Sequence, residues 1–144
     1  MQLIRSFDQD NAALVGFGIR VMLLSKQSQE GPLARRLAGL GGMLEHCQEM
    51  YEALEAVIED PAGYGLFVLD CDEFGGIEAG RKAVTMMGEL ARRIPVILIS
   101  KECQDQSFPQ DRGAPTMLRA PLSSVSLRVG FEHALRDRLA VRLI

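Results

Sequence analysis

The chain has 144 residues, of which 47% are hydrophobic and 24% are charged, and its formal net charge is −3. This length and composition are typical of one globular domain with its own hydrophobic core. The excess of acids does not provide the broad positive surface that nucleic-acid binding needs, so we expect no nucleic-acid partner.

Neither the cysteines nor the apolar segments indicate secretion or a membrane. Cys47, Cys71 and Cys103 are odd in number and lack the C-x-x-C spacing of zinc sites. No apolar run approaches the roughly 18 residues that a transmembrane helix requires. Asp8 and Asp10 interrupt the N-terminal apolar residues, where a signal peptide would be continuous. We therefore expect a cytoplasmic protein with no membrane partner.

From residue 20 onward, short apolar runs alternate with segments of helical periodicity, which is typical of β-α units in a parallel sheet. The predicted strands are residues 20–24, 43–47, 65–69, 96–99 and 115–119. The predicted helices are residues 33–40, 50–58, 77–93 and 123–139, with a short or distorted helix in 101–113.

These elements predict an α/β fold, a flavodoxin-like three-layer sandwich. Its five-stranded parallel sheet has the strand order 2-1-3-4-5, with helices on both faces. Residues 1–18 are expected to form an N-terminal extension, and residues 19–144 the domain itself.

Polar side chains follow the predicted strands at the edge where open parallel sheets bind their ligands. After the first, third, fourth and fifth strands come, in turn, Ser25-Lys26-Gln27, Asp70 with Asp72 and Glu73, Ser100, and Arg119-Ala120-Pro121. A candidate site therefore comprises these residues.

The order and spacing of these residues resemble the receiver domain of two-component response regulators, over residues 20 to 140. In that family the third strand ends in an aspartate that accepts a phosphoryl group, and Asp70 matches this position. Ser100 matches the hydroxyl residue that senses the phosphoryl group. The resemblance implies a non-enzymatic signalling module whose partner is a histidine kinase or a downstream regulator.

The sequence also departs from the receiver pattern. Ser25 and Lys26 stand where receivers place two acids that hold Mg²⁺, and Ala120 stands where a lysine precedes the proline, here Pro121. Mg²⁺ binds through oxygen ligands, and phosphoryl transfer depends on charge neutralisation. We therefore predict a degenerate receiver (pseudo-receiver) with no metal and no cofactor. It would act through protein–protein contacts, including a homodimer through the last strand and helix.

Several alternatives remain open at this point. One is a working receiver that is phosphorylated on Asp70 and uses Mg²⁺, and another is a stand-alone binder of a small ligand. Lys26 and Arg119 are candidates to supply positive charge in place of the metal and the lysine. Asp72 and Glu73 either form a displaced metal site with Asp70 or belong to a solvated loop that caps the next helix. His46 and His133 are assigned no role.

Overall fold

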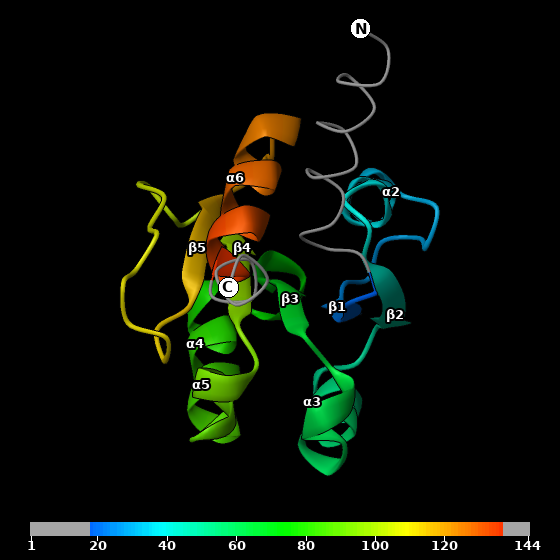
Figure 1. Ribbon diagram of the computed structural model, residues 1–144. Helices are drawn as coiled ribbons and strands as arrows, with labels where there is room; N and C mark the ends of the chain where they lie inside the picture. The colour runs from blue at the N-terminus through cyan, green and yellow to red at the C-terminus, as the bar shows by residue number, and fades with distance from the viewer. Residues whose placement is uncertain (1–17, 137–144) are drawn as a thin grey trace, which may run out of the picture.

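The computed structural model describes residues 18–136, which contain one five-stranded parallel sheet (Figure 1). The strands are β1 (Arg20–Leu24), β2 (Met43–Cys47), β3 (Leu66–Asp70), β4 (Val96–Ser100) and β5 (Thr116–Arg119). Their order in the sheet is β2-β1-β3-β4-β5, which confirms the predicted fold class and strand order. Residues 1–17 of the expected extension, and the last helix beyond residue 136, lie outside the described residues.

Helices cover both faces of the sheet (Figure 1). On one face lie α2 (Pro32–Gly39) and α6 (Ser124–Ala134), and on the other α3 (Met50–Glu59), α4 (Ile77–Met87) and α5 (Leu90–Arg93). Side chains of a strand alternate between faces, so Phe67 and Leu69 pack with α3 to α5, while Leu66 and Val68 pack with α2 and α6. This two-sided burial explains why the central strands β1, β3 and β4 are nearly continuous apolar runs.

Local sequence features set where the helices begin. Pro32 occupies the first turn of α2, where its missing N–H costs no hydrogen bond. The Glu49 carboxylate accepts a hydrogen bond from the backbone N–H of Glu52 at 2.7 Å, which caps α3. The Ser123 hydroxyl oxygen accepts one from the N–H of Ser126 at 3.0 Å and caps α6.

Two predicted helices differ from the structure. The single helix expected over residues 77–93 is broken at Gly88, whose φ of 58° lies in the left-handed region, so α4 and α5 are separate. No helix forms in residues 101–113, where a short or distorted one was expected. This segment is held instead by an antiparallel bridge between Ser107 and Met117 of β5. Two short 3₁₀ turns, η1 (Pro61–Gly63) and η2 (Cys71–Phe74), flank β3.

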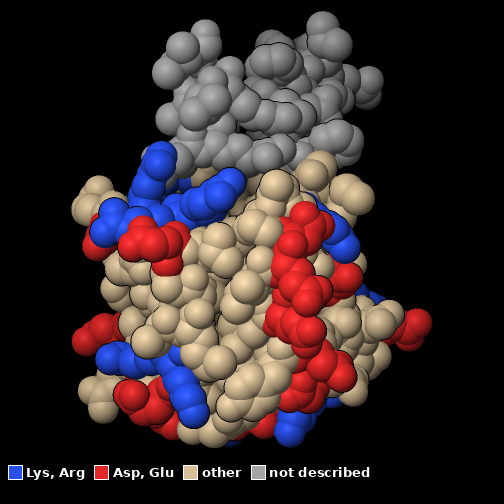
Figure 2. All heavy atoms as spheres, turned by 90° about the horizontal axis from the view of Figure 1, so that it is seen from below, with Lys and Arg blue, Asp and Glu red and all other residues tan. Residues whose placement is uncertain are grey.

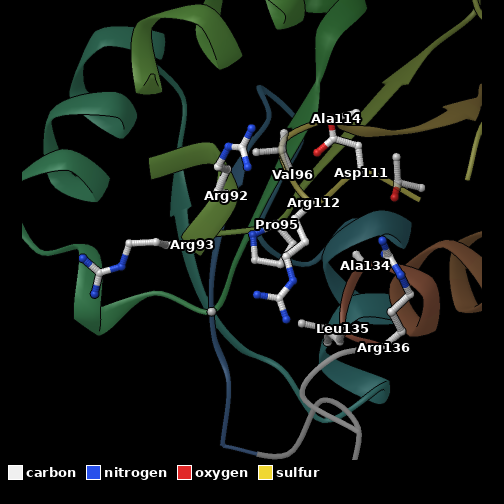
Figure 3. Close-up of a pocket in the computed structure, with 12 residues that line it drawn as sticks. Arg92, Arg93, Pro95, Val96, Asp111, Arg112, Ala114, Ala134, Leu135 and Arg136 are labelled. Atoms are coloured by element: carbon white, nitrogen blue, oxygen red, sulfur yellow. The ribbon is translucent and has the colours of Figure 1, made fainter. Parts of the chain in front are cut away.

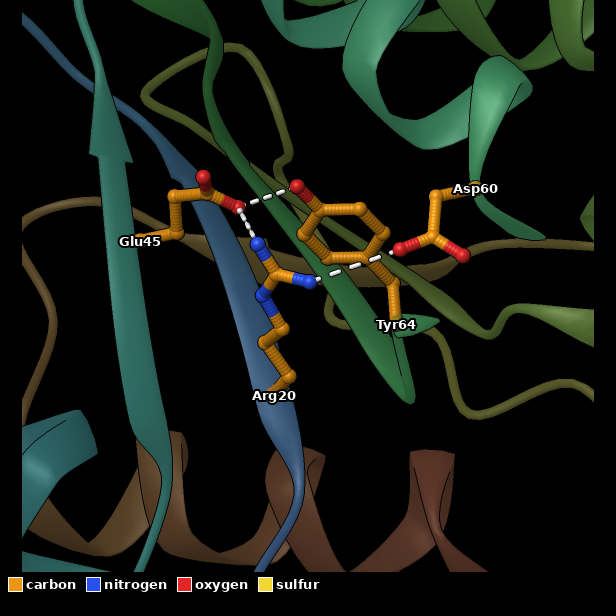
Figure 4. A network of polar contacts seen from close by, with 4 residues as sticks. All are labelled: Arg20, Glu45, Asp60 and Tyr64. Carbon is orange, nitrogen blue, oxygen red and sulfur yellow. Dashed lines mark hydrogen bonds and ion pairs between the residues drawn. The ribbon is translucent and has the colours of Figure 1, made fainter. Parts of the chain in front are cut away.

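A polar network lies at the start of the sheet (Figure 4). The Arg20 guanidinium pairs with Glu45 at 3.1 Å and Asp60 at 3.5 Å, and its central carbon lies 4.5 Å from the centre of the Tyr64 ring. The Tyr64 hydroxyl donates a hydrogen bond to Glu45. Burial, with further contributions from Glu45, raises the pKa of Tyr64 to about 12. The network joins β1, β2 and the segment that enters β3.

Candidate functional site

The site is built where β1, β3 and β4 end. Asp70 is the last residue of β3, Ser25 directly follows β1, and Ser100 is the last residue of β4. All three are buried, with exposed fractions of 9% for Asp70, 1% for Ser25 and 0% for Ser100. The fold therefore brings together polar residues that the sequence separates by up to 75 positions.

Two side chains from the loop after β1 donate hydrogen bonds to the same oxygen of Asp70. The Ser25 hydroxyl lies 3.2 Å from Oδ2 of Asp70, and Nε2 of Gln27 lies 3.3 Å from it. The backbone N–H of Gln27 also donates to the Ser25 hydroxyl oxygen at 3.1 Å, a local turn that brings the amide side chain back over the strand ends. The sequence predicts that Gln27 lies in this loop but carries no signal for its contact with Asp70.

Among the neighbouring acids, Glu73 has the largest effect on the pKa of Asp70. Burial, followed by a hydrogen bond with Glu73 and the charge of Glu73, raises the pKa of Asp70 to about 6, while the hydrogen bond from Ser25 opposes this rise. One oxygen of Glu73 also lies 3.5 Å from the Ser25 hydroxyl. Asp70 therefore holds a proton more tightly than an ordinary aspartate does.

Asp72 faces β4 rather than Asp70. It accepts a hydrogen bond from the Ser100 hydroxyl at 2.5 Å and another from the backbone N–H of Lys101 at 2.8 Å. The expectation that the acidic loop caps the next helix is wrong, because the residue before α4 is Gly76, with no side-chain cap. Through these two hydrogen bonds, Asp72 connects the end of β3 to the end of β4.

Lys26 and Arg119, the two basic residues proposed to supply positive charge at the site, do not contact Asp70 in the structure. The Lys26 ammonium lies 5.2 Å from the centre of the Phe74 ring, and its side chain is exposed. Arg119 is also exposed, and its backbone N–H faces Oε1 of Gln106 at 3.4 Å. The contacts described for Asp70 come from Ser25, Gln27 and Glu73 and include no cationic group.

Ala120 and Pro121 belong to a second part of the same edge. The backbone N–H of Ala120 donates to the carbonyl of Ser100 at 3.1 Å, and the Ala120–Pro121 peptide bond is cis. Both residues line a shallow cavity of about 330 Å³ with Arg119 and Ser123. The structure therefore places Arg119, Ala120 and Pro121 beside Ser100 and gives them no contact with Asp70.

His46 has a contact that the sequence did not reveal. Its Nε2 lies 2.7 Å from the backbone carbonyl of Ser25, at the end of β2. His133, by contrast, faces the carbonyl of Pro109 at 2.7 Å, on the far side of the sheet. Cys71 is buried and packs in the core as a small apolar residue.

Comparison with solved structures gives several receiver domains. A response regulator receiver domain protein from Clostridium thermocellum matches with a TM-score of 0.68 and 13% identity, covering 85% of this chain and 98% of its own. The chain has the receiver fold. No family model matches the sequence, and no curated protein matches it significantly.

Two other structures with the receiver fold extend this comparison. The receiver domain of a sensor histidine kinase from Pseudomonas aeruginosa, with magnesium coordinated in its active site cleft, has a TM-score of 0.62 and 13% identity, covering 83% of this chain and 98% of its own. The anti-anti-sigma factor PhyR from Bartonella quintana has a TM-score of 0.56 and 20% identity, covering 95% of this chain and 57% of its own. These three receiver-fold structures therefore cover 83% to 95% of this chain.

The donors around Asp70 do not match the three-acid magnesium site that the receiver resemblance implies. Within residues 18–136, no three His, Cys, Asp or Glu side chains converge in a group able to hold a metal ion. Asp72, a member of the displaced metal site considered above, instead accepts hydrogen bonds from the Ser100 hydroxyl and the Lys101 N–H in this structure. A separate finding concerns membranes: no helix among the described residues is long and apolar enough to cross one.

Proposed function

We propose that this domain is a degenerate receiver, a non-enzymatic signal-transduction module that acts through protein–protein contacts without accepting a phosphoryl group on Asp70. The observation that carries this proposal is the set of contacts around Asp70: a serine hydroxyl, a glutamine amide and a second carboxyl group. A phosphoryl group would add negative charge to a site where two acids lie together and where, among residues 18–136, no cation contacts Asp70. Phosphoryl transfer depends on neutralising that charge, so this environment opposes it.

The partner is a signalling protein, either a histidine kinase or a downstream regulator, and the outer surface of α6 suits such a contact. Val125 and Val129 lie one turn apart on this helix and are 72% and 45% exposed. Phe131 and Leu135 are buried against the sheet, so the two faces of α6 have different roles. The same surface of β5 and α6 could instead bind a second copy of this chain and form a homodimer. The segment before β5 borders this surface as a loop and not as a helix.

A working phosphoacceptor is the alternative function, and one observation favours it. Asp70 keeps its place at the end of β3, and Glu73 supplies a second carboxylate beside it. One or two carboxylates with water and phosphate oxygens are sufficient for many Mg²⁺ sites. The two functions predict opposite results with a phosphodonor.

The deciding experiment is incubation of the protein with Mg²⁺ and acetyl phosphate, followed by intact-mass measurement. We expect no mass gain in the wild-type chain, while an active receiver domain treated in parallel gains one phosphoryl group. A gain of one phosphoryl group in the wild-type chain that disappears in Asp70→Asn would establish the working phosphoacceptor and overturn the proposal.

A further inference from the structure

A cavity of about 530 Å³ lies between α3 and α4, two helices that pack beside each other on one face of the sheet. Tyr51 lines it from the first turn of α3, and Ala79 and Lys82 line it from α4. Phe74 of η2, the turn that follows β3, also contributes to its wall. Asp70 is not among the lining residues, so the cavity is adjacent to the candidate site but separate from it.

The walls of this cavity continue along both helices as an apolar groove. Each helix joins two parallel strands, so α3 and α4 run in the same direction. Seven positions are close to two helical turns, which places Ile58 on the same side of α3 as Tyr51, about 10 Å further along. Met86 has the same relation to Ala79 on α4. Tyr51, Ile58 and Met86 are 57%, 43% and 44% exposed, and exposed apolar side chains that gather in this way typically mark an interaction site.

The outer surface of α3 is acidic, and the helix contains no basic residue. Glu52, Glu55 and Glu59 are exposed and lie three or four positions apart, so they form an acidic stripe next to the apolar groove. None of the three forms an ion pair with another residue of 18–136. Like charges at this spacing destabilise a helix, and Glu59 also opposes the helix dipole at the C-terminal end. A basic partner would remove this repulsion.

The opposite rim of the groove, on α4, carries positive charge. Lys82 is exposed and has no ion pair within residues 18–136, while Arg81 pairs with Glu78 at 3.9 Å. Lys26 and Glu49 also line the cavity and balance each other in charge. Figure 2 views the molecule from the side where α3 to α5 lie, and it shows an acidic band on one side of a largely uncharged surface. Basic side chains, with a few acids, lie on the other side, so the two rims differ in charge.

A second cavity, of about 410 Å³, lies where β3, β4 and β5 begin (Figure 3), and contacts within the domain account for it. The Arg136 guanidinium donates to the carbonyls of Pro109 at 3.1 Å and Gln110 at 3.0 Å, which holds the loop before β5 against α6. By contrast, within residues 18–136 no side-chain hydrogen bond or ion pair joins α3 to α4. The groove between these helices is therefore open to a partner.

We propose that the groove between α3 and α4 binds an amphipathic α-helix of a partner protein. The apolar face of that helix packs against Tyr51 and Ile58 on one wall and Met86 on the other, through residues about seven positions apart. Its basic flank lies along the acidic stripe, and its other flank carries an acid that faces Lys82. This inference rests on the proposed function in one respect, which is that the domain acts through protein–protein contacts. It adds a surface separate from the outer face of α6.

The test is isothermal titration calorimetry of the full chain with a designed helical peptide of about 14 residues, which is roughly 20 Å long. This probe peptide has leucines on one face, lysines on one flank of that face and glutamates on the other flank. A control peptide keeps the leucines and has glutamine in place of every lysine and glutamate. We expect the probe peptide to bind more tightly than the control peptide, with an affinity that falls as salt rises.

Two double variants test the two kinds of surface in the groove. Glu55→Lys/Glu59→Lys reverses the acidic stripe and should weaken binding of the probe peptide about fivefold or more. Tyr51→Ser/Met86→Ser removes an apolar side chain from each wall and should weaken it about tenfold or more. All four side chains are exposed, so we expect both variants to fold.

Each variant has a matched control outside the groove. Glu30→Lys/Asp105→Lys reverses two exposed loop acids, and Val125→Ser/Val129→Ser removes two exposed apolar side chains from α6. Both controls should leave the affinity for the probe peptide within about twofold of wild type. A loss of affinity in a control as large as in its partner variant would contradict the proposal.

An NMR titration of the wild-type chain keeps the test valid if a variant fails to fold. The probe peptide should shift the backbone amides of Ile58 and Lys82 and leave those of Val125 and Val129 unchanged. The proposal is overturned if the probe peptide does not bind, if the control peptide binds as tightly, or if the shifts lie on α6. Self-association that Tyr51→Ser/Met86→Ser abolishes would also overturn it, because a second copy would then occupy the groove. Phosphorylation of Asp70 would refute the degenerate receiver alone, so the two failures are distinguishable.

Discussion

The hydroxyl of Ser100 donates its hydrogen bond to Asp72, at 2.5 Å, and not to Asp70. Ser100, which matches the position of the phosphoryl-sensing hydroxyl of receivers, is therefore hydrogen-bonded to an acid of η2, the turn that follows β3. Both partners link β3 to β4, and Lys101 adds a backbone N–H to the same carboxylate. This arrangement suits a fixed strand-to-strand connection.

Removing the Asp72 carboxylate should destabilise the domain. In Asp72→Ala, the Ser100 hydroxyl loses its acceptor while it remains buried, so we expect the free energy of unfolding to fall by about 1–3 kcal/mol. Urea denaturation followed by circular dichroism measures this change. Asp105→Ala removes an exposed acid and should change stability by less than about 0.5 kcal/mol. Equal effects of the two substitutions would show that the Asp72 contacts contribute nothing.

The raised pKa of Asp70 makes stability depend on pH with a defined sign. The folded-state pKa of about 6 lies above the ordinary value of 3.8, so the folded state holds the proton more tightly and stability falls as pH rises from about 4 to 6. Asp70→Asn removes this dependence and should be more stable than wild type at pH 7, by about 1–3 kcal/mol. Urea titrations at several pH values measure both effects. A variant less stable than wild type at pH 7 would contradict the assignment.

Glu73 should account for part of the shift at Asp70. In Glu73→Gln, the neighbouring charge disappears, and the pKa of Asp70 should fall toward its ordinary value without reaching it, because burial is the larger cause. NMR titration of the Asp70 carboxyl carbon measures this pKa. Glu78→Gln, at an exposed position on α4, serves as the control and should leave it unchanged. An unchanged Asp70 pKa in Glu73→Gln would show that the two carboxyls do not interact.

The packing of α4 against the sheet depends on Gly80. A Cβ atom there would lie 2.5 Å from Sγ of Cys71 and 2.9 Å from Cδ2 of Leu98, so the helix would have to move. Gly80→Ala should therefore destabilise the domain by about 1–3 kcal/mol, despite the better helix propensity of alanine. Gly39→Ala in α2, where a Cβ would meet no side chain or other segment within 4 Å, should be neutral or slightly stabilising. Thermal melts of the two variants test the contrast.

The sequence predicted the sheet well, because the three central strands β1, β3 and β4 are apolar runs buried on both faces and are bounded by polar or turn residues. It predicted the helices less well where one backbone angle decides the outcome. Gly88 reads as part of a continuous helical pattern, yet its positive φ separates α4 from α5. The segment 101–113 lacked an apolar period, and the structure holds it through the Ser107–Met117 bridge, a long-range contact with no local signal.

The candidate site was predicted in its location but not in its contacts. Strand order alone places Ser25, Asp70 and Ser100 at one edge, and this could be inferred from sequence. The partners of Asp70 depend on side-chain directions after each strand. Gln27 turns back over the strand end, while Asp72 turns away toward β4. Those directions follow from the loop geometry, which neither composition nor periodicity encodes.

On the proposed function, Asp70 is not phosphorylated because Ser25, Lys26 and Ala120 replace the two acids and the lysine of the receiver pattern. The most direct measurement is the phosphorylated fraction of two chains treated with Mg²⁺ and acetyl phosphate: the wild type and the triple variant Ser25→Asp/Lys26→Asp/Ala120→Lys. We predict that the variant gains a phosphoryl group, that adding Asp70→Asn abolishes this gain, and that the wild type gains none. Equal phosphorylation of Asp70 in the wild type and the triple variant would contradict the account.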